Sequence, residues 1–183
     1  MEKLSGSRAL IFSKDPDYVI GPEQLTDLLS LLDTATVQRE PLPGVDIDPL
    51  GFRPGPVAAD LGLQFGGTSR DRISVVTTPH FFPGPDMTLF CPTELCRANV
   101  QDEFWEALGG GNFSADAIPT LECPECRQTH KINRVYMSDG GALVSFAVVV
   151  EQALTLPDTT SAVWAKLEQL LGTPLKWINQ ETP

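Results

Sequence analysis

Long apolar runs are absent from this chain of 183 residues. No run of about 18 apolar residues occurs, so the sequence predicts no membrane-spanning helix. The opening residues, MEKLSGSRAL, also lack the apolar core of a secretory signal. Together these absences predict a soluble, cytoplasmic protein.

Basic residues are scarce, because 13 Lys and Arg stand against 24 Asp and Glu and give a net charge of −11. Non-specific binding to nucleic acid depends on a basic surface, so this class of function is disfavoured. An acidic surface commonly serves only to keep a protein soluble. It also suits a basic partner, and we expect any partner to be another protein rather than a nucleic acid or a membrane.

Motifs of the common catalytic classes are lacking too. The chain has two histidines and no GxSxG, HExxH or Walker sequence. We therefore favour a non-enzymatic protein-interaction or accessory function. The alternative is a hydrolase or transferase with a site built from the loops at 41–56 and 79–86. It requires a polar pocket in which His80 meets carboxylates, and the candidates are Asp46, Asp48 and Asp86.

Four cysteines are present, and they form two close pairs. Cys91 and Cys96 lie in CPTELC, Cys123 and Cys126 lie in CPEC, and 26 residues separate the pairs. Each short pair holds two sulfurs on a tight turn, and two facing turns supply four thiolates at about 2.3 Å from one ion. The spacing therefore predicts one zinc ion held by all four cysteines. Four thiolates fill a tetrahedral shell, which indicates a structural rather than a catalytic metal.

The segment 89–131 resembles a zinc ribbon, in which two cysteine turns face each other across one ion. The spacer is longer than the roughly 15–20 residues of the common pattern. The sequence QDEFWEALGGG within it predicts an inserted helix. The resemblance implies a zinc-ribbon-like module at 89–131 embedded in a single domain that spans 1–183.

Other roles for the cysteines remain open. CPEC alone could be a thioredoxin-like redox pair, which needs a helix that starts at its first cysteine. The four residues could form two disulfides, or they could bind iron in place of zinc. A zinc deaminase is disfavoured, because neither histidine begins His-x-Glu. His130, four positions after Cys126, could also act as a ligand, although four sulfurs leave it no place in the shell.

The hydrophobic pattern predicts an α+β fold, with an antiparallel-containing sheet and two helices packed on it. Leucines at helical spacing predict a helix over 22–33, and a second apolar stripe predicts a helix that begins near Thr160 or Ser161 and stops at Gly172. Residues 142–150 are almost continuously apolar, which predicts one central strand covered on both faces. The turn sequence SDGG predicts a hairpin between this strand and INRVYM.

Shorter elements are also expected. Strands are predicted at 9–13 and 72–78, with weaker strand signals at 34–38 and 57–67 and a short edge segment at LKWI. Asn99 is a candidate N-cap for a helix over VQDEFWEAL.

Overall fold

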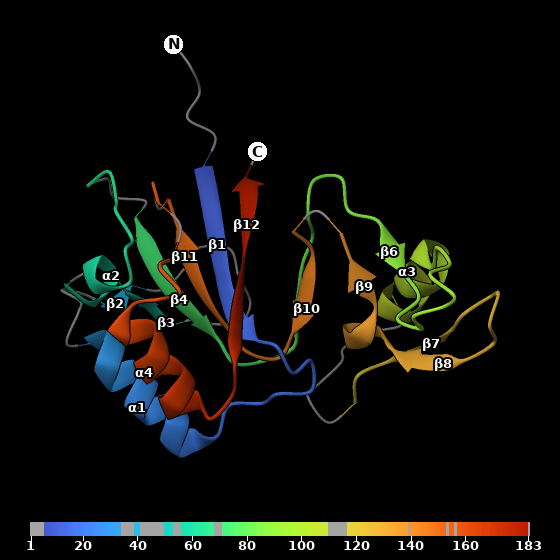
Figure 1. Ribbon diagram of the computed structural model, residues 1–183, viewed down its shortest axis with the longest axis horizontal. Coiled ribbons are helices and arrows are strands. Elements are labelled where there is room, and N and C mark those ends of the chain that lie inside the picture. Colours follow the sequence, from blue (N-terminus) through green and yellow to red (C-terminus); the bar gives the residue numbers. More distant parts are fainter. Residues whose placement is uncertain are drawn as a thin grey trace, which may run out of the picture.

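The computed structural model is a mixed α+β fold with antiparallel sheets, as the sequence predicts. It describes residues 6–33, 39–40, 50–52, 56–67, 71–109, 117–138, 140–152, 154–155 and 157–182. The largest sheet and two helices form one end of the molecule, and the cysteine-bearing elements form the other (Figure 1). The weak strand signal at 34–38 lies outside the described residues.

The largest sheet has six antiparallel strands in the order β12-β1-β11-β4-β3-β2. Strand β12 is a sheet edge, as expected for LKWI, but it is eight residues long and pairs with β1 over its whole length. The bounds are β1 Gly6–Ser13, β2 Arg39–Glu40, β3 Leu50–Phe52, β4 Arg72–Val76, β11 Ala147–Glu151 and β12 Leu175–Thr182.

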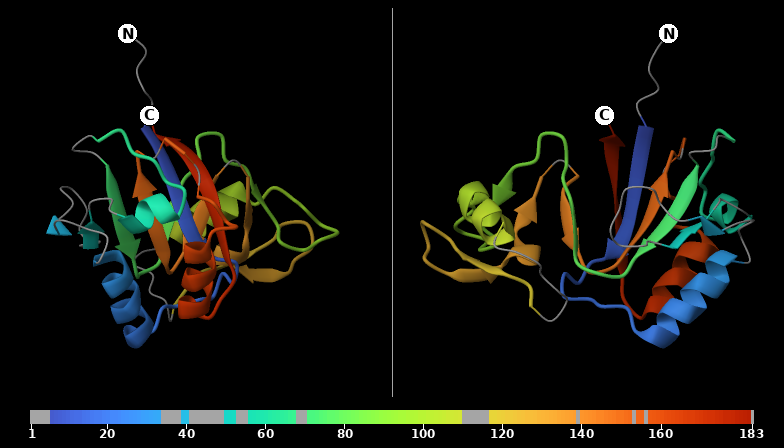
Figure 2. Two further views of the ribbon diagram at one scale, coloured as in Figure 1. Left: turned by 60° about the vertical axis from the view of Figure 1, so that its left-hand side comes forward. Right: turned by 180° about the vertical axis from the view of Figure 1, so that it is seen from behind.

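Helices α1 (Pro22–Asp33) and α4 (Ala162–Leu171) lie side by side on one face of this sheet (Figures 1 and 2). Both were predicted from their apolar stripes. The Ser161 hydroxyl accepts a hydrogen bond from the Trp164 N–H at the start of α4, and Gly172 with φ 66° ends the helix. The two helices and the sheet share one core, which includes Ala9, Ile11, Leu28, Leu167 and Leu171.

Residues 57–67 do not form the predicted strand, because α2 covers Pro56–Asp60. The buried side chains Ala58 and Leu61 are three positions apart. That spacing places both on one face of a helical turn, so the weak alternation of the sequence was misleading.

The predicted continuous strand at 142–150 is interrupted at Ser145 and Phe146. Its first part, β10 (Ala142–Val144), pairs with β5 (His80–Phe82) in a second layer. Its second part, β11, lies between β1 and β4 and is covered on both faces, as predicted. The interruption lets the Phe146 side chain enter the core on the helix side of the sheet. There its ring packs edge-on against the Tyr18 ring, with the two ring centres 5.7 Å apart.

The predicted hairpin through SDGG is wrong. Residues 132–134 form the 3-10 helix η1 (Ile132–Arg134), and β9 (Tyr136–Met137) pairs with β6 (Leu89–Phe90) instead of β10. Gly140, with φ 78°, does turn the chain there. The turn joins two different sheets, because β10 takes β5 as its partner and β6 offers a free edge to β9.

The elements from β6 to β9, described at residues 89–109 and 117–137, form what we call the cysteine lobe. It also contains α3 (Gln101–Gly109), β7 (Thr120–Glu122) and β8 (Thr129–Lys131). The predicted helix is present as α3, and the Asn99 side chain accepts a hydrogen bond from the Gln101 N–H. The lobe has its own core, in which Leu89, Val100, Phe104 and Ile132 are fully buried.

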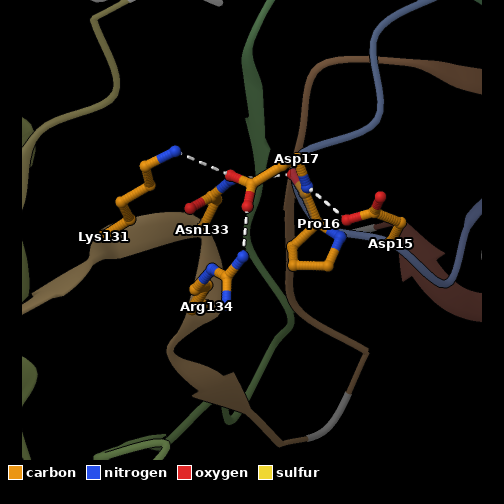
Figure 3. A network of polar contacts seen from close by, with 6 residues as sticks. All are labelled: Asp15, Pro16, Asp17, Lys131, Asn133 and Arg134. Atoms are coloured by element: carbon orange, nitrogen blue, oxygen red, sulfur yellow. Dashed lines mark hydrogen bonds and ion pairs between the residues drawn. The ribbon is translucent and has the colours of Figure 1, made fainter.

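Asp17, in the loop after β1, joins the sheet to the cysteine lobe (Figure 3). Its carboxylate accepts hydrogen bonds from Lys131 Nζ at 3.0 Å, Asn133 Nδ2 at 3.2 Å and Arg134. Asn133 Nδ2 also donates to the Pro16 carbonyl at 2.7 Å. The hydrogen bonds from Arg134 and Lys131 lower the pKa of Asp17 from 3.8 to about 2.

We expect Asp17→Asn to destabilise the protein by about 1 kcal/mol at pH 7, since solvent screens a partly exposed ion pair. A carboxylate with a depressed folded pKa stabilises the fold fully above its unfolded pKa. Its contribution should therefore be constant above about pH 5 and disappear as the pH falls from about 5 toward 2. Urea unfolding of the wild-type and Asp17→Asn proteins across this pH range measures the difference in their unfolding free energies. Acid effects that both proteins share cancel in this difference. A difference that stays constant down to pH 2.5 or so would contradict the ion-pair assignment.

No helix in the described part of the chain is long and apolar enough to cross a membrane.

Candidate metal centre

The two cysteine pairs sit on turns of the same design. Cys91 directly follows β6, and Cys123 directly follows β7. The Cys91 N–H donates to the Ala98 carbonyl at 2.8 Å, and the Cys123 N–H donates to the Gln128 carbonyl at 2.9 Å. In both turns the acceptor lies two positions after the second cysteine. Two short strands thus deliver two matching turns, which agrees with the knuckle arrangement that the resemblance implies.

Each turn reverses at an arginine with positive φ. Arg97 (φ 51°) follows Cys96, and Arg127 (φ 58°) follows Cys126. This left-handed conformation is uncommon for residues other than glycine. It lets the next N–H point back at the sulfur, so that Ala98 donates to Cys96 and Gln128 donates to Cys126. Neither arginine is predicted from the cysteine spacing, although each directly follows the second cysteine of its pair in the sequence.

The four sulfurs lie within 4.8 Å of one another. Across the two turns, the Sγ atoms of Cys91 and Cys126 are 3.8 Å apart, and those of Cys96 and Cys123 are 3.7 Å apart. A tetrahedron of sulfurs at about 2.3 Å from a central ion has edges of about 3.8 Å. A disulfide requires about 2.05 Å. The cluster therefore has the dimensions of a tetrathiolate metal site, and all four cysteines are free thiols.

The sulfurs differ in burial. Cys91 and Cys123 are fully buried and belong to the core of the lobe, whereas Cys96 and Cys126 are partly exposed. One cysteine of each turn is thus fixed by apolar packing, and the other closes the site from the solvent side. A metal at this place would tie the two turns together in addition to this packing.

The pKa values of the two partly exposed thiols, Cys96 and Cys126, shift in opposite directions. The hydrogen bond from the Gln128 N–H is the main reason that the pKa of Cys126 falls to about 6. The Ala98 N–H lowers the pKa of Cys96 in the same way, but desolvation and the three neighbouring thiols outweigh it and raise this pKa to about 12. Four sulfurs this close cannot all ionise unless a cation offsets their charge. A divalent ion supplies that charge and favours four thiolates.

His130 lies beside the sulfurs. Its Nε2 atom is 3.6 Å from Cys91 Sγ and 3.2 Å from Thr93 Oγ1. The Thr93 hydroxyl donates to Gln128 Oε1 at 2.9 Å and so links the two turns. The imidazole is therefore placed to hydrogen-bond a ligand sulfur, a role that orients ligands in metal sites.

A thioredoxin-like role for CPEC finds no support. Cys126 is followed by a turn and then by strand β8, and no helix starts at Cys123. Such redox pairs depend on a helix N-terminus to stabilise the thiolate.

The residues of the alternative loop-built site are only partly described. Asp46 and Asp48 lie outside the described residues. His80 is on β5, where its ring centre lies 4.6 Å from that of Phe82 with the two ring planes tilted by 58°. Burial, followed by repulsion from Arg8, lowers the pKa of His80. Among the described residues, no hydrogen bond or ion pair joins His80 to Asp86, which is exposed. The structure thus brings the cysteines together but gives no sign of convergence around His80.

Comparison of the chain with protein-family models, curated proteins and solved structures returned no match.

Proposed function

We propose that this protein binds one structural zinc ion through Cys91, Cys96, Cys123 and Cys126. The observation that carries the proposal is the pair of cross-turn sulfur distances, 3.7 and 3.8 Å, which match a tetrathiolate zinc site. Iron accepts the same four ligands, so the metal itself has to be measured. The ion's role is to hold the two turns, and with them the cysteine lobe, in one arrangement.

The proposal extends to a non-enzymatic binding function. Four thiolates leave no open coordination position for water or substrate, so the metal is unsuited to catalysis. The alternative of a hydrolase or transferase rests on His80 with Asp46, Asp48 or Asp86, and of these carboxylates only Asp86 is described, with no hydrogen bond or ion pair to His80. The expected basic protein partner is untested and stays a prediction.

Elemental analysis of the purified protein tests the metal assignment. We expect about one zinc per chain, and free-thiol titration should find the four cysteines protected until a chelator is added. Cys126→Ser should lower the zinc content strongly, while Thr129→Ser, an exposed change in β8, should leave it at the wild-type level. Iron at one equivalent would correct the metal and keep the site. Little metal of any kind, together with disulfide-bonded cysteines, would contradict the proposal.

A further inference from the structure

A cavity of about 640 Å³ lies between the sheet and the cysteine lobe. Its walls come from the end of β1, from β10 and β12, and from the first cysteine turn together with η1 and β9. Its volume falls in the range of about 300–1,000 Å³ that is typical of small-molecule sites.

The charge of this cavity is opposite to that of the protein. Its lining includes Lys14, Arg97, Arg134 and Lys176, and no Asp or Glu among the residues that the structure describes. Four of the 13 basic residues of the chain therefore face one cavity, whereas no described acidic residue lines it. In a protein with a net charge of −11, this concentration of positive charge requires a specific explanation.

Two of these cations lie on the sheet side. Lys176 is the cross-strand partner of Phe12, and its ammonium lies 4.9 Å from the centre of the Phe12 ring. Desolvation, followed by repulsion from Lys14, lowers the pKa of Lys176. Within the described part of the chain, neither lysine forms an ion pair. The two like charges are thus held near each other, and no described Asp or Glu forms an ion pair with either of them.

The other two cations come from the cysteine lobe. Arg134 is already paired with Asp17, so its charge is largely compensated. Arg97 forms no ion pair with any described residue, and its guanidinium lies 5.3 Å from the centre of the Tyr136 ring. This cation–π contact positions the guanidinium of Arg97 beside the cavity. Uncompensated charge therefore stands on both sides of the cavity.

The remaining lining combines apolar and polar side chains. Leu143, Val144 and Ile178 supply apolar surface. Thr93 and Asn133 also belong to the lining, but their donors already serve Gln128, Pro16 and Asp17. A ligand that suits this lining carries concentrated negative charge at one part and an apolar or ring portion at another.

We propose that this cavity binds a small organic phosphate, such as a nucleoside diphosphate. A phosphate group carries about two negative charges at neutral pH, and it matches both a lysine pair and a guanidinium fork. A long nucleic acid strand is disfavoured, because it would have to approach a surface that is acidic overall. The inference rests on the proposed function in one respect, since the metal-held lobe supplies Arg97 and one wall of the cavity.

Calorimetric titration of metal-loaded protein tests this inference. The probes are ADP, pyrophosphate, adenosine, citrate and a single-stranded oligonucleotide. We expect ADP and pyrophosphate to bind with an affinity that falls as salt rises, and adenosine to bind at least about tenfold more weakly than ADP. Lys176→Gln should weaken ADP binding by about tenfold or more. Lys166→Gln, which removes the same charge from an exposed position of α4, should leave it unchanged.

Melting curves of the ligand-free variants exclude a folding defect. Lys176→Gln should melt at or above the wild-type temperature, because the substitution relieves repulsion from Lys14. Lys14→Gln removes the other charge of this lysine pair and should also weaken ADP binding.

The possible failures can be told apart. Protein with one zinc and normal melting that binds neither ADP nor pyrophosphate would overturn the ligand inference and leave the metal proposal standing. Protein that binds ADP but contains no zinc would overturn the metal proposal and leave the ligand inference standing. Equal losses in Lys166→Gln and Lys176→Gln, or tighter binding of citrate or of the oligonucleotide than of ADP, would also overturn the assignment of a small organic phosphate.

Discussion

Replacing Cys123 with serine is expected to unfold the cysteine lobe while the six-stranded sheet and its two helices stay folded. Cys123 is fully buried, and its sulfur faces Cys96 at 3.7 Å across the site. Loss of one thiolate leaves the ion under-coordinated, and structural zinc supplies on the order of 10 kcal/mol of folding free energy to small zinc domains. Apart from the metal site, the described strands of the lobe form only the two-stranded sheets β6–β9 and β7–β8, which add little stability. The sheet keeps a separate core with α1 and α4.

Melting curves and limited trypsin digestion measure this effect. Wild-type protein treated with a chelator should behave like Cys123→Ser, with early cleavage after Arg97, Arg127 or Lys131 and a resistant remnant that contains the sheet. Thr129→Ser is the matched control, because it changes an exposed hydroxyl of β8 and no ligand. If wild-type, chelated and substituted proteins melt together and resist trypsin equally, the metal is not structural.

Replacing Phe146 with alanine is expected to cost about 3–5 kcal/mol of unfolding free energy. Phe146 is only 2% exposed and fills the core between the sheet and the helices, where its ring meets Tyr18. Such a loss is a large part of the roughly 5–15 kcal/mol that stabilises a typical domain. Urea unfolding provides the measurement.

Phe65→Ala serves as the control for Phe146→Ala, since Phe65 packs on the same core but is only partly buried. Its cost should be clearly smaller. The zinc content should stay at one equivalent in both variants, because neither residue belongs to the core of the cysteine lobe. A cost for Phe146→Ala below that for Phe65→Ala would contradict the assignment of Phe146 to the centre of the core.

The features that the sequence predicts well depend on neighbouring residues. Helix α1 begins at Pro22, and α4 is framed by Ser161 and Gly172, which are local start and stop signals. The four-cysteine cluster is also predictable, because two close pairs can be recognised without knowledge of the fold between them.

The features that the sequence does not predict depend on distant partners. Asp17 is separated from Lys131 and Arg134 by 114 and 117 positions, and no local pattern connects them. The apolar run at 142–150 hides the interruption at Phe146, since two successive strands that are each buried read as one. The cavity could not be predicted either, because Arg97 lines it together with Lys14 and Lys176 only when the lobe lies beside the sheet.

Strand β10 limits how this protein can be divided or recombined. Leu143 is buried in the core of the cysteine lobe, whereas its neighbours Ala142 and Val144 are buried against the sheet. A fragment cut at 89–131 would therefore lose Ile132, Val135 and Leu143 from its hydrophobic interior. The cysteine lobe is therefore not an independent unit, because its core takes a side chain from a strand that also packs on the sheet. Substitutions at Leu143 should consequently be constrained by both halves of the molecule at once.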